Sequence, residues 1–363
     1  MRHLLVKLIA IGVFLSPSSA MSHHSGPAVY DPDNIGEIEG ILTNLLWRNP
    51  HVSFTLDVTD NNGETTSWLV EGGSPARLER RGVVRDFLSL GSTITVAGQL
   101  ARSGDARLRV TNVLLPTGEE LLLLSNTYPL RWDTDKAVGT EDLGIDSETR
   151  SDAIEDARSI FRVWMFDFGN SSAIDSLWNE DYPLTEYAAN YRRDYDPEKD
   201  PSLVECTPPG MPTAMNMPYP LEFTEVGDTI VMRQEVMDIR RTFHMAPDAS
   251  AKASMQTPGL MGYSVGHWEG EVLVVETSRI DWPYFDQRGL PQGKDVTLVE
   301  RFILSEDETR LDYELVVTDP ATFTEPVTLD NYWVWLPGEE VGDWDCQMFD
   351  PIREYLIEKI QEG

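Results

Sequence analysis

Histidine offers the clearest chemistry in this sequence. His23 and His24 stand together near the amino terminus, and His51 ends the motif Trp-Arg-Asn-Pro-His at 47–51. Neutral imidazole is the commonest metal ligand, and a second hydrogen bond usually fixes its ring. If a leader peptide is removed before His23, the free amine and ring of that residue chelate one cation, and His51 completes a three-nitrogen site. Nitrogen-rich tetragonal ligation favours Cu(II), so the three histidines are candidate copper ligands. The alternative is a histidine pair that only fixes the amino-terminal segment by hydrogen bonds.

Glu71 is a carboxylate candidate for the same site. It follows an apolar Trp-Leu-Val run at 68–70 and precedes two glycines. At that strand end its carboxylate can accept from the backbone of a following helix, or from Arg77, Arg80 or Arg81. Structural pairing of this kind is the first expectation. A carboxylate ligand for the histidine site is the alternative.

A second polar set lies in the C-terminal half of the chain. Period-two alternation places Arg240 and His244 on one face of a strand and Arg241 on the other. If the inner face carries Arg240 and His244 together with Glu300, it holds a cation, a base and an acid. Such a group predicts acid–base catalysis of the lyase, isomerase or hydrolase type, or recognition of the polar end of an apolar ligand. A buried ion-pair network or a solvated sheet face is the alternative.

Further candidate ligand-binding side chains come from the same half. Some share a strand face, some flank a hairpin corner, and some belong to an aromatic, acidic loop that we expect over a barrel mouth. They are Arg233, Glu235, His267, Trp268, Trp282, Tyr284, Asp286 and Arg288.

The elements that must position these residues are mainly β-strands. Residues 202–349 show eight alternating segments joined by tight turns, which is typical of an up-and-down, lipocalin-like barrel or a curved sheet. An eight-stranded barrel can enclose one small ligand. The expected strands are 221–226, 229–236, 239–245, 262–268, 272–278, 296–304, 311–318 and 329–336.

Residues 23–126 predict a smaller β domain. Five short strands and one helix in about 100 residues favour an OB-like barrel. Ser74 can cap the helix, which Pro75 begins and Gly82 ends. The expected strands are 37–46, 52–58, 66–70, 93–100 and 108–114.

The remaining segments are predicted as a linker and a terminal helix. Within the linker, 127–201, helical spacing appears at 151–164 and again at 184–195. Tyr187, Tyr191 and Tyr195 form a stripe on the second of these helices, and we expect that stripe to pack in the core. The end of the chain, 350–363, is expected to be helical.

The amino terminus predicts export. Residues 1–22 combine a positive start with a short apolar run, as in a signal peptide, and place the protein in the periplasm or outside the cell. Cleavage before Met21 and cleavage before His23 both satisfy the small-residue rule. No later stretch is long and apolar enough for a membrane span. An oxidising compartment permits a bond between Cys206 and Cys346 across about 140 residues, with two buried thiols as the alternative.

Charge excludes one class of partner. The formal net charge is −32, from 29 Lys and Arg against 61 Asp and Glu. An acidic surface repels phosphate backbones, so nucleic acid is not an expected partner. No nucleophile elbow, phosphate-binding loop, dinucleotide fingerprint or zinc-protease motif occurs.

Several short motifs resemble those of an uncharacterised, exported, two-part bacterial family. The N-terminal part of that family shows the His-His-Ser and Asn-Pro-His motifs, and the C-terminal part shows Gly-x-Trp-Glu-Gly. The resemblance implies architecture and export and brings no reaction with it. The matching stretches here are 23–25, 47–51, 68–73, 78–82, 206–212, 266–277, 286–291, 299–302 and 318–320.

Three functions are therefore expected, in order. The first is an exported soluble protein that binds a small, partly apolar molecule in a β-barrel. The second is an acid–base enzyme centred on His244. The third is a copper-binding periplasmic protein. No pattern in the sequence sets the oligomeric state.

Overall fold

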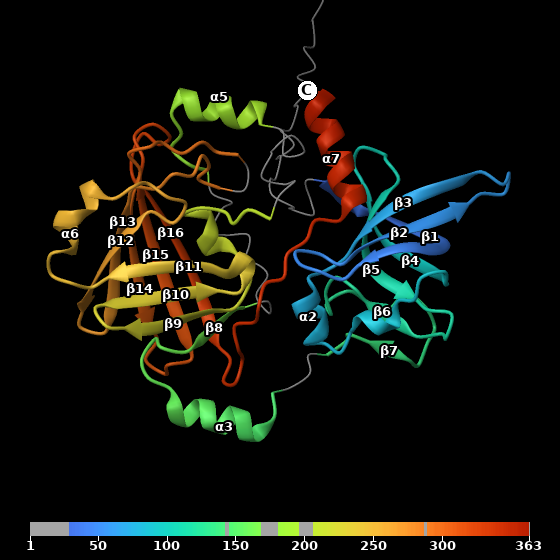
Figure 1. The fold of residues 1–363 in the computed structure, drawn as a ribbon, viewed down its shortest axis with the longest axis horizontal. Helices are drawn as coiled ribbons and strands as arrows, with labels where there is room; N and C mark the ends of the chain where they lie inside the picture. Colours follow the sequence, from blue (N-terminus) through green and yellow to red (C-terminus); the bar gives the residue numbers. More distant parts are fainter. Residues whose placement is uncertain (1–28, 142–144, 168–180, 196–205, 287–288, 363) are drawn as a thin grey trace, which may run out of the picture.

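The computed structural model describes residues 29–141, 145–167, 181–195, 206–286 and 289–362, and they form two β units (Figure 1). The first unit is a seven-stranded sheet with the order β3-β2-β1-β4-β5-β6-β7. An additional pairing of β3 with β5 closes the first five strands into a ring, which confirms the expected OB-like barrel. The strands are β1 (Tyr30–Leu46), β2 (Ser53–Thr59), β3 (Thr65–Glu71), β4 (Thr93–Ala101), β5 (Arg107–Leu114), β6 (Glu120–Leu122) and β7 (Ala137–Val138).

Helix α2 (Pro75–Glu79) begins where its sequence predicts. The Ser74 side chain accepts a hydrogen bond from the Arg77 backbone N–H, and Pro75 occupies the first turn. Leu78 is fully buried in the core of the first unit. The helix is shorter than predicted, because the chain leaves helical geometry after Arg80 and Gly82 adopts a positive φ of 74°. A 3-10 turn, η1 (Arg85–Phe87), follows it.

The second unit is a closed barrel of nine strands. All neighbouring strands pair antiparallel except β11 and β12, which pair parallel. Alternate residues are buried along most strands, so one face of each points into the barrel. In barrel order the strands are β10 (Thr229–Gln234), β11 (Ile239–His244), β12 (Tyr263–Glu269), β13 (Val272–Ser278), β14 (Thr297–Leu304), β15 (Arg310–Thr318), β16 (Val327–Trp335), β8 (Val163–Phe166) and β9 (Leu221–Val226).

Strand β8 shows where the linker prediction was wrong. We expected 151–164 to be helical, but helix α3 (Ser147–Asp156) ends earlier and buries none of its residues. Val163–Phe166 instead pairs with β16 and β9 and so completes the barrel. Trp164 and Phe166 gain full burial in this strand, so tertiary contacts outweigh the local helical spacing. The barrel therefore begins inside the segment that we expected to be a linker.

The prediction that the tyrosine stripe packs in the core was wrong for Tyr187 and Tyr191. Helix α5 (Glu186–Asp194) forms with Thr185 as its cap, and it buries only Ala188. Tyr187 and Tyr191 are exposed and contact each other, with ring centroids 6.0 Å apart. The remaining short helices are η4 (Thr213–Asn216), η5 (Val236–Asp238), α6 (Ala249–Lys252) and η6 (Ala253–Met255).

Aromatic rings meet across the inside of the barrel. Phe223 of β9 and Phe302 of β14 lie on opposite walls, yet their ring centroids are 5.3 Å apart. Phe302 also contacts Phe243 and Tyr313, and Tyr313 contacts Trp333. All of these residues are buried, so one level of the interior is filled by side chains.

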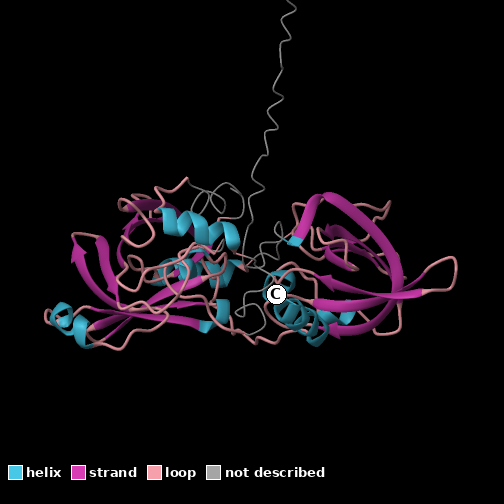
Figure 2. Ribbon diagram, turned by 90° about the horizontal axis from the view of Figure 1, so that it is seen from above, coloured by secondary structure: helices cyan, strands magenta, loops and turns pink. Residues whose placement is uncertain are grey.

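The chain returns from the barrel to the first unit at its end. After β16, residues 336–349 run as a strap toward the first unit, and helix α7 (Asp350–Glu362) lies against it (Figure 1). Figure 2 shows the two β units side by side in a second view. Phe349 and Ile352 pack there beside Leu46 and Leu69. Cys346 of the strap is disulfide-bonded to Cys206. The part of the chain that the structure describes contains no helix long and apolar enough to cross a membrane.

Candidate functional site

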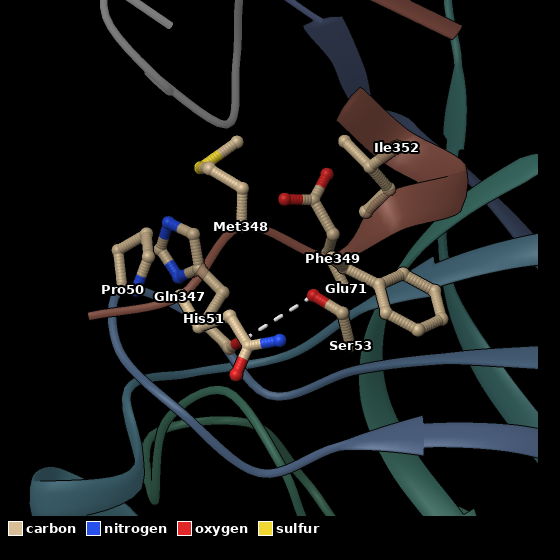
Figure 3. A pocket seen from close by; sticks show the side chains of 8 residues that line it. All are labelled: Pro50, His51, Ser53, Glu71, Gln347, Met348, Phe349 and Ile352. Carbon is tan, nitrogen blue, oxygen red and sulfur yellow. Dashed lines mark hydrogen bonds between the residues drawn. The ribbon is translucent and has the colours of Figure 1, made fainter. Parts of the chain in front are cut away.

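A pocket lies where the strap meets the first unit. The pocket is partly open to solvent, and the space inside it together with its mouth is about 240 Å³. The room left between its side chains accommodates a group about the size of one water molecule. Figure 3 shows the His51 ring, the Glu71 carboxylate and the Met348 thioether around the same space. The lining residues are Pro50, His51, Ser53, Glu71, Gln347, Met348, Phe349 and Ile352.

Two adjacent strands of the first unit position the polar side chains. His51 lies near the end of the loop between β1 and β2, and Glu71 is the last residue of β3. Ser53 pairs with Glu71 across β2 and β3, and the Ser53 hydroxyl donates to the His51 carbonyl oxygen at 3.2 Å. The sheet register therefore brings residues 20 positions apart to one edge.

Glu71 belongs to a buried charged network. The Tyr30 hydroxyl donates to its Oε2 at 2.5 Å, and the Arg107 guanidinium lies 3.7 Å from the same oxygen. Arg107 also lies over the ring of Tyr355 in α7, 4.5 Å from its centroid. Burial raises the pKa of Tyr30 well above its usual value, and the Glu71 charge adds to this effect. The phenol therefore stays protonated and remains a donor to Glu71. The expected pairing of Glu71 with arginine is formed, but the partner is Arg107 instead of a residue in or after α2.

The His51 side chain is held as a neutral imidazole. The residue is half-buried, and burial lowers the pKa of its ring. The Glu71 charge partly offsets this, whereas Arg109 lowers the pKa further. The imidazole also interacts with the backbone of Gly72. These contacts orient the ring beside Glu71 in the pocket.

Backbone pairing fixes the strap at the other wall. The Asn49 N–H donates to the Asp345 carbonyl at 3.1 Å, and the Gln347 N–H donates to the Asn49 carbonyl at 2.9 Å. These bonds bracket a parallel bridge between Asn49 and Cys346. Met348 therefore follows directly after a segment paired with the loop that holds His51.

The expected catalytic group is not formed as predicted. Arg240 is exposed and pairs with Asp238, whereas Glu300 is fully buried inside the barrel. His244 stacks on Tyr263, with ring centroids 4.5 Å apart, and lies on the same outer face as Arg240. Burial of the His244 ring lowers its pKa, and Lys252 lowers it further. The inner face of β11 is the other one, so Arg241 is the residue that meets Glu300.

Arg241 and Glu300 form a buried polar network in place of the expected catalytic group. The guanidinium donates to both carboxylate oxygens of Glu300, at 2.9 and 2.6 Å. Tyr313 and Thr277 donate to the same carboxylate at 2.9 and 3.1 Å. Ser264 accepts from Arg241 at 3.3 Å. The charges are thus neutralised inside the barrel, and this arrangement matches the ion-pair alternative.

Arg233 and Glu235 hold the two units together. Glu235 is fully buried and accepts from Arg80 of the first unit at 2.8 Å and from the Gly342 N–H at 3.0 Å. Arg233 donates to the carbonyl oxygens of Val341 and Gly342, each at 3.0 Å. Both residues therefore anchor the strap and do not line the barrel interior.

The other expected ligand contacts are dispersed. Trp282 and Asp286 are buried, and Tyr284 is half-buried beside Trp282, in the loop between β13 and β14. His267 is exposed near Glu269, and the Trp268 ring contacts Phe161. Three expected site residues, His23, His24 and Arg288, lie outside the described residues.

Part of the chain is similar to a known family. Residues 13–109 match the model of a family of unknown function, DUF6152. That span contains His51 and Glu71 of the pocket and their neighbours Tyr30 and Arg107, whereas the pocket residues of the strap and α7 lie outside it. The comparison with curated proteins found no match. Among the described residues, no three His, Cys, Asp or Glu side chains are grouped for a metal ion.

Proposed function

We propose that this is an exported protein that binds one copper ion in the pocket at His51 and Glu71. The observation that supports the proposal is the pocket that His51 and Glu71 both line. Their imidazole and carboxylate face a space large enough for one small group. Imidazole nitrogen suits copper, and nitrogen-rich ligand sets favour Cu(II). The signal-peptide pattern of residues 1–22 supports export, which would give the site a periplasmic or extracellular setting.

The remaining ligands would come from the amino terminus. Tyr30 is close to the first residue that the structure describes, and its hydroxyl donates to Glu71, which lines the pocket. The amino-terminal part of the described chain therefore lies beside the pocket. His23 lies seven residues before Tyr30, and seven residues span at most about 24 Å when extended. The segment is therefore long enough for His23 or His24 to reach His51. With His23 as the first residue, its amine and ring supply two nitrogens and His51 supplies a third.

Titration of the protein with Cu(II) tests this proposal. A chain that begins at His23 is expected to bind one equivalent, and His51→Ala is expected to weaken binding by at least tenfold. His267→Ala is the matched control, because His267 is exposed on the outside of the barrel. A chain that begins at Met21 needs separate titration, since its amine, backbone nitrogens and third-position His23 can chelate Cu(II) without His51. Unchanged Cu(II) affinity in His51→Ala of the His23-first protein would contradict the proposal.

The barrel is a second candidate site, for a small uncharged ligand. Gln234 and Asn331 are buried and face the interior, and neither the oxygen nor the nitrogen of either amide has a hydrogen-bond partner. The Trp333 indole N–H has none either. Buried polar atoms without partners are costly, so they favour a bound polar molecule or enclosed water. Because Arg241 and Glu300 neutralise each other, the unmatched groups suit hydrogen-bonding groups without charge.

Native mass spectrometry of the purified chain tests the barrel proposal. A bound neutral molecule should appear as a mass increment that Asn331→Leu removes. Thr328→Leu, at an exposed position of the same strand, is the control. Equal increments in both variants, or none in the unaltered protein, would exclude a ligand at Asn331.

The proposed family relationship extends beyond residues 13–109, which the family model matches. We propose that the C-terminal half carries its own family motif, Gly-x-Trp-Glu-Gly at 266–270, joined to the DUF6152 match at 13–109. Relatives with both parts in one chain would support a shared exported architecture. Consistent separation of the two parts in other chains would contradict it.

A further inference from the structure

Met348 stands beside the proposed copper ligands in a way that packing does not explain. Its neighbours Phe349 and Ile352 are 5% and 2% exposed and form a small apolar cluster with Leu46 and Leu69. Met348 is not part of that cluster and is half-buried. Its side chain lines the pocket instead, next to His51.

The strap holds Met348 in this place by several independent restraints. Cys346, two residues earlier, is disulfide-bonded to Cys206. Gln347 donates its backbone N–H to Asn49, which lies two residues before His51. Helix α7 begins two residues later and is fixed by Tyr355, which donates to Asp105 at 2.7 Å. The thioether is thus presented to the pocket by a segment anchored on both sides.

We infer that the Met348 sulfur is a copper ligand, and that it gives the site affinity for Cu(I) in addition to Cu(II). This inference rests on the proposed copper site at His51 and Glu71. Thioether sulfur is a soft ligand that selects Cu(I), whereas imidazole suits both oxidation states. Met348 comes from the C-terminal strap, so the site joins the first unit to the C-terminal part of the chain. The region matched by the family model contains His51 and Glu71 but does not extend to Met348.

Separate affinities for the two copper ions test the role of Met348. The full chain beginning at His23 is titrated with Cu(II), and Cu(I) affinity is measured by competition with the chelator bicinchoninate. Met348→Leu is expected to lower Cu(I) affinity by at least tenfold and to change Cu(II) affinity by less than threefold. The reduction potential of bound copper should then fall by about 59 mV for each tenfold selective loss of Cu(I). Met255→Leu is the matched control, because Met255 is 74% exposed and does not line the pocket.

The outcomes distinguish failure of the Met348 ligand from failure of the proposed copper site at His51 and Glu71. Unchanged Cu(I) affinity in Met348→Leu, with Cu(II) still bound through His51, overturns only the thioether ligand. Equal losses of Cu(I) and Cu(II) affinity indicate that Met348 shapes the pocket without binding copper, and they also overturn it. Absence of Cu(II) binding in the unaltered protein overturns the copper site itself.

Discussion

The buried pair of Arg241 and Glu300 gives the sharpest test of how the barrel is stabilised. Glu300 is fully buried, and its carboxylate accepts two hydrogen bonds from Arg241 and one each from Tyr313 and Thr277. Glu300→Gln keeps the volume but removes the charge that compensates the guanidinium. The Gln amide nitrogen also cannot accept, so at least one of the four donors loses its partner.

The expected loss is large by the standards of single substitutions. Removing one partner of a buried ion pair typically costs about 3–5 kcal/mol, because the other charge stays buried and uncompensated. The neighbouring pair of Arg301 and Glu269 is a matched control at 3.0 Å on the outer face. Exposed pairs of that kind contribute little to stability, because water screens their attraction. Glu269→Gln should therefore be several-fold milder than Glu300→Gln.

Urea unfolding followed by tryptophan fluorescence measures both variants. Trp164 and Trp333 are fully buried in the barrel and report its unfolding. A double variant, Arg241→Met with Glu300→Leu, should recover much of the lost stability, since apolar replacement of a buried pair is often neutral or stabilising. A loss of stability in Glu300→Gln that is no larger than the loss in Glu269→Gln would refute this account of the barrel interior.

Three further predictions follow from individual contacts. Ser74→Ala should destabilise the first unit by about 1 kcal/mol through loss of the α2 cap, as measured by thermal unfolding, and no change would contradict the cap. Burial and Lys252 lower the pKa of His244 in the folded chain below its value of 6.5 in the unfolded chain. The unfolded chain therefore takes up the proton first, and stability falls as the pH drops below about 6.5. His244→Asn should flatten this pH dependence of the urea midpoint, whereas an unchanged slope would exclude His244 as its source. Glu235→Gln should loosen the strap by weakening the contact with Arg80, so limited proteolysis should cut residues 336–349 faster than in the unaltered chain.

Much of the barrel was accessible from the sequence because period-two alternation is strong there. All eight expected strands of the second unit occur, and β9 and β13 have the predicted bounds. The ninth strand, β8, was missed because four residues carry too little periodic signal. Its pairing partners are distant in the sequence, and only the closed barrel shows that Trp164 and Phe166 are needed there.

The errors at the polar residues have two causes. Alternation separates the two faces of a strand but does not say which face is inside, so a shift of one residue exchanges them. Arg240 and Arg241 are adjacent, and the choice between them decided the whole predicted catalytic group. Similarly, Arg107 was missed as the partner of Glu71, and Tyr30 as its donor, because the sequence gives no signal for contacts between strands so far apart. His51 could be singled out from the sequence, since it ends the Asn-Pro-His motif and its imidazole is a common metal ligand.

The most direct test of the copper site is the mass and metal content of the protein purified from its own export route. We predict an intact mass that begins at His23, with one copper per chain that is absent from His51→Ala. A mass that begins at Met21 with no bound copper, or copper retained in full by His51→Ala, would contradict the proposed site.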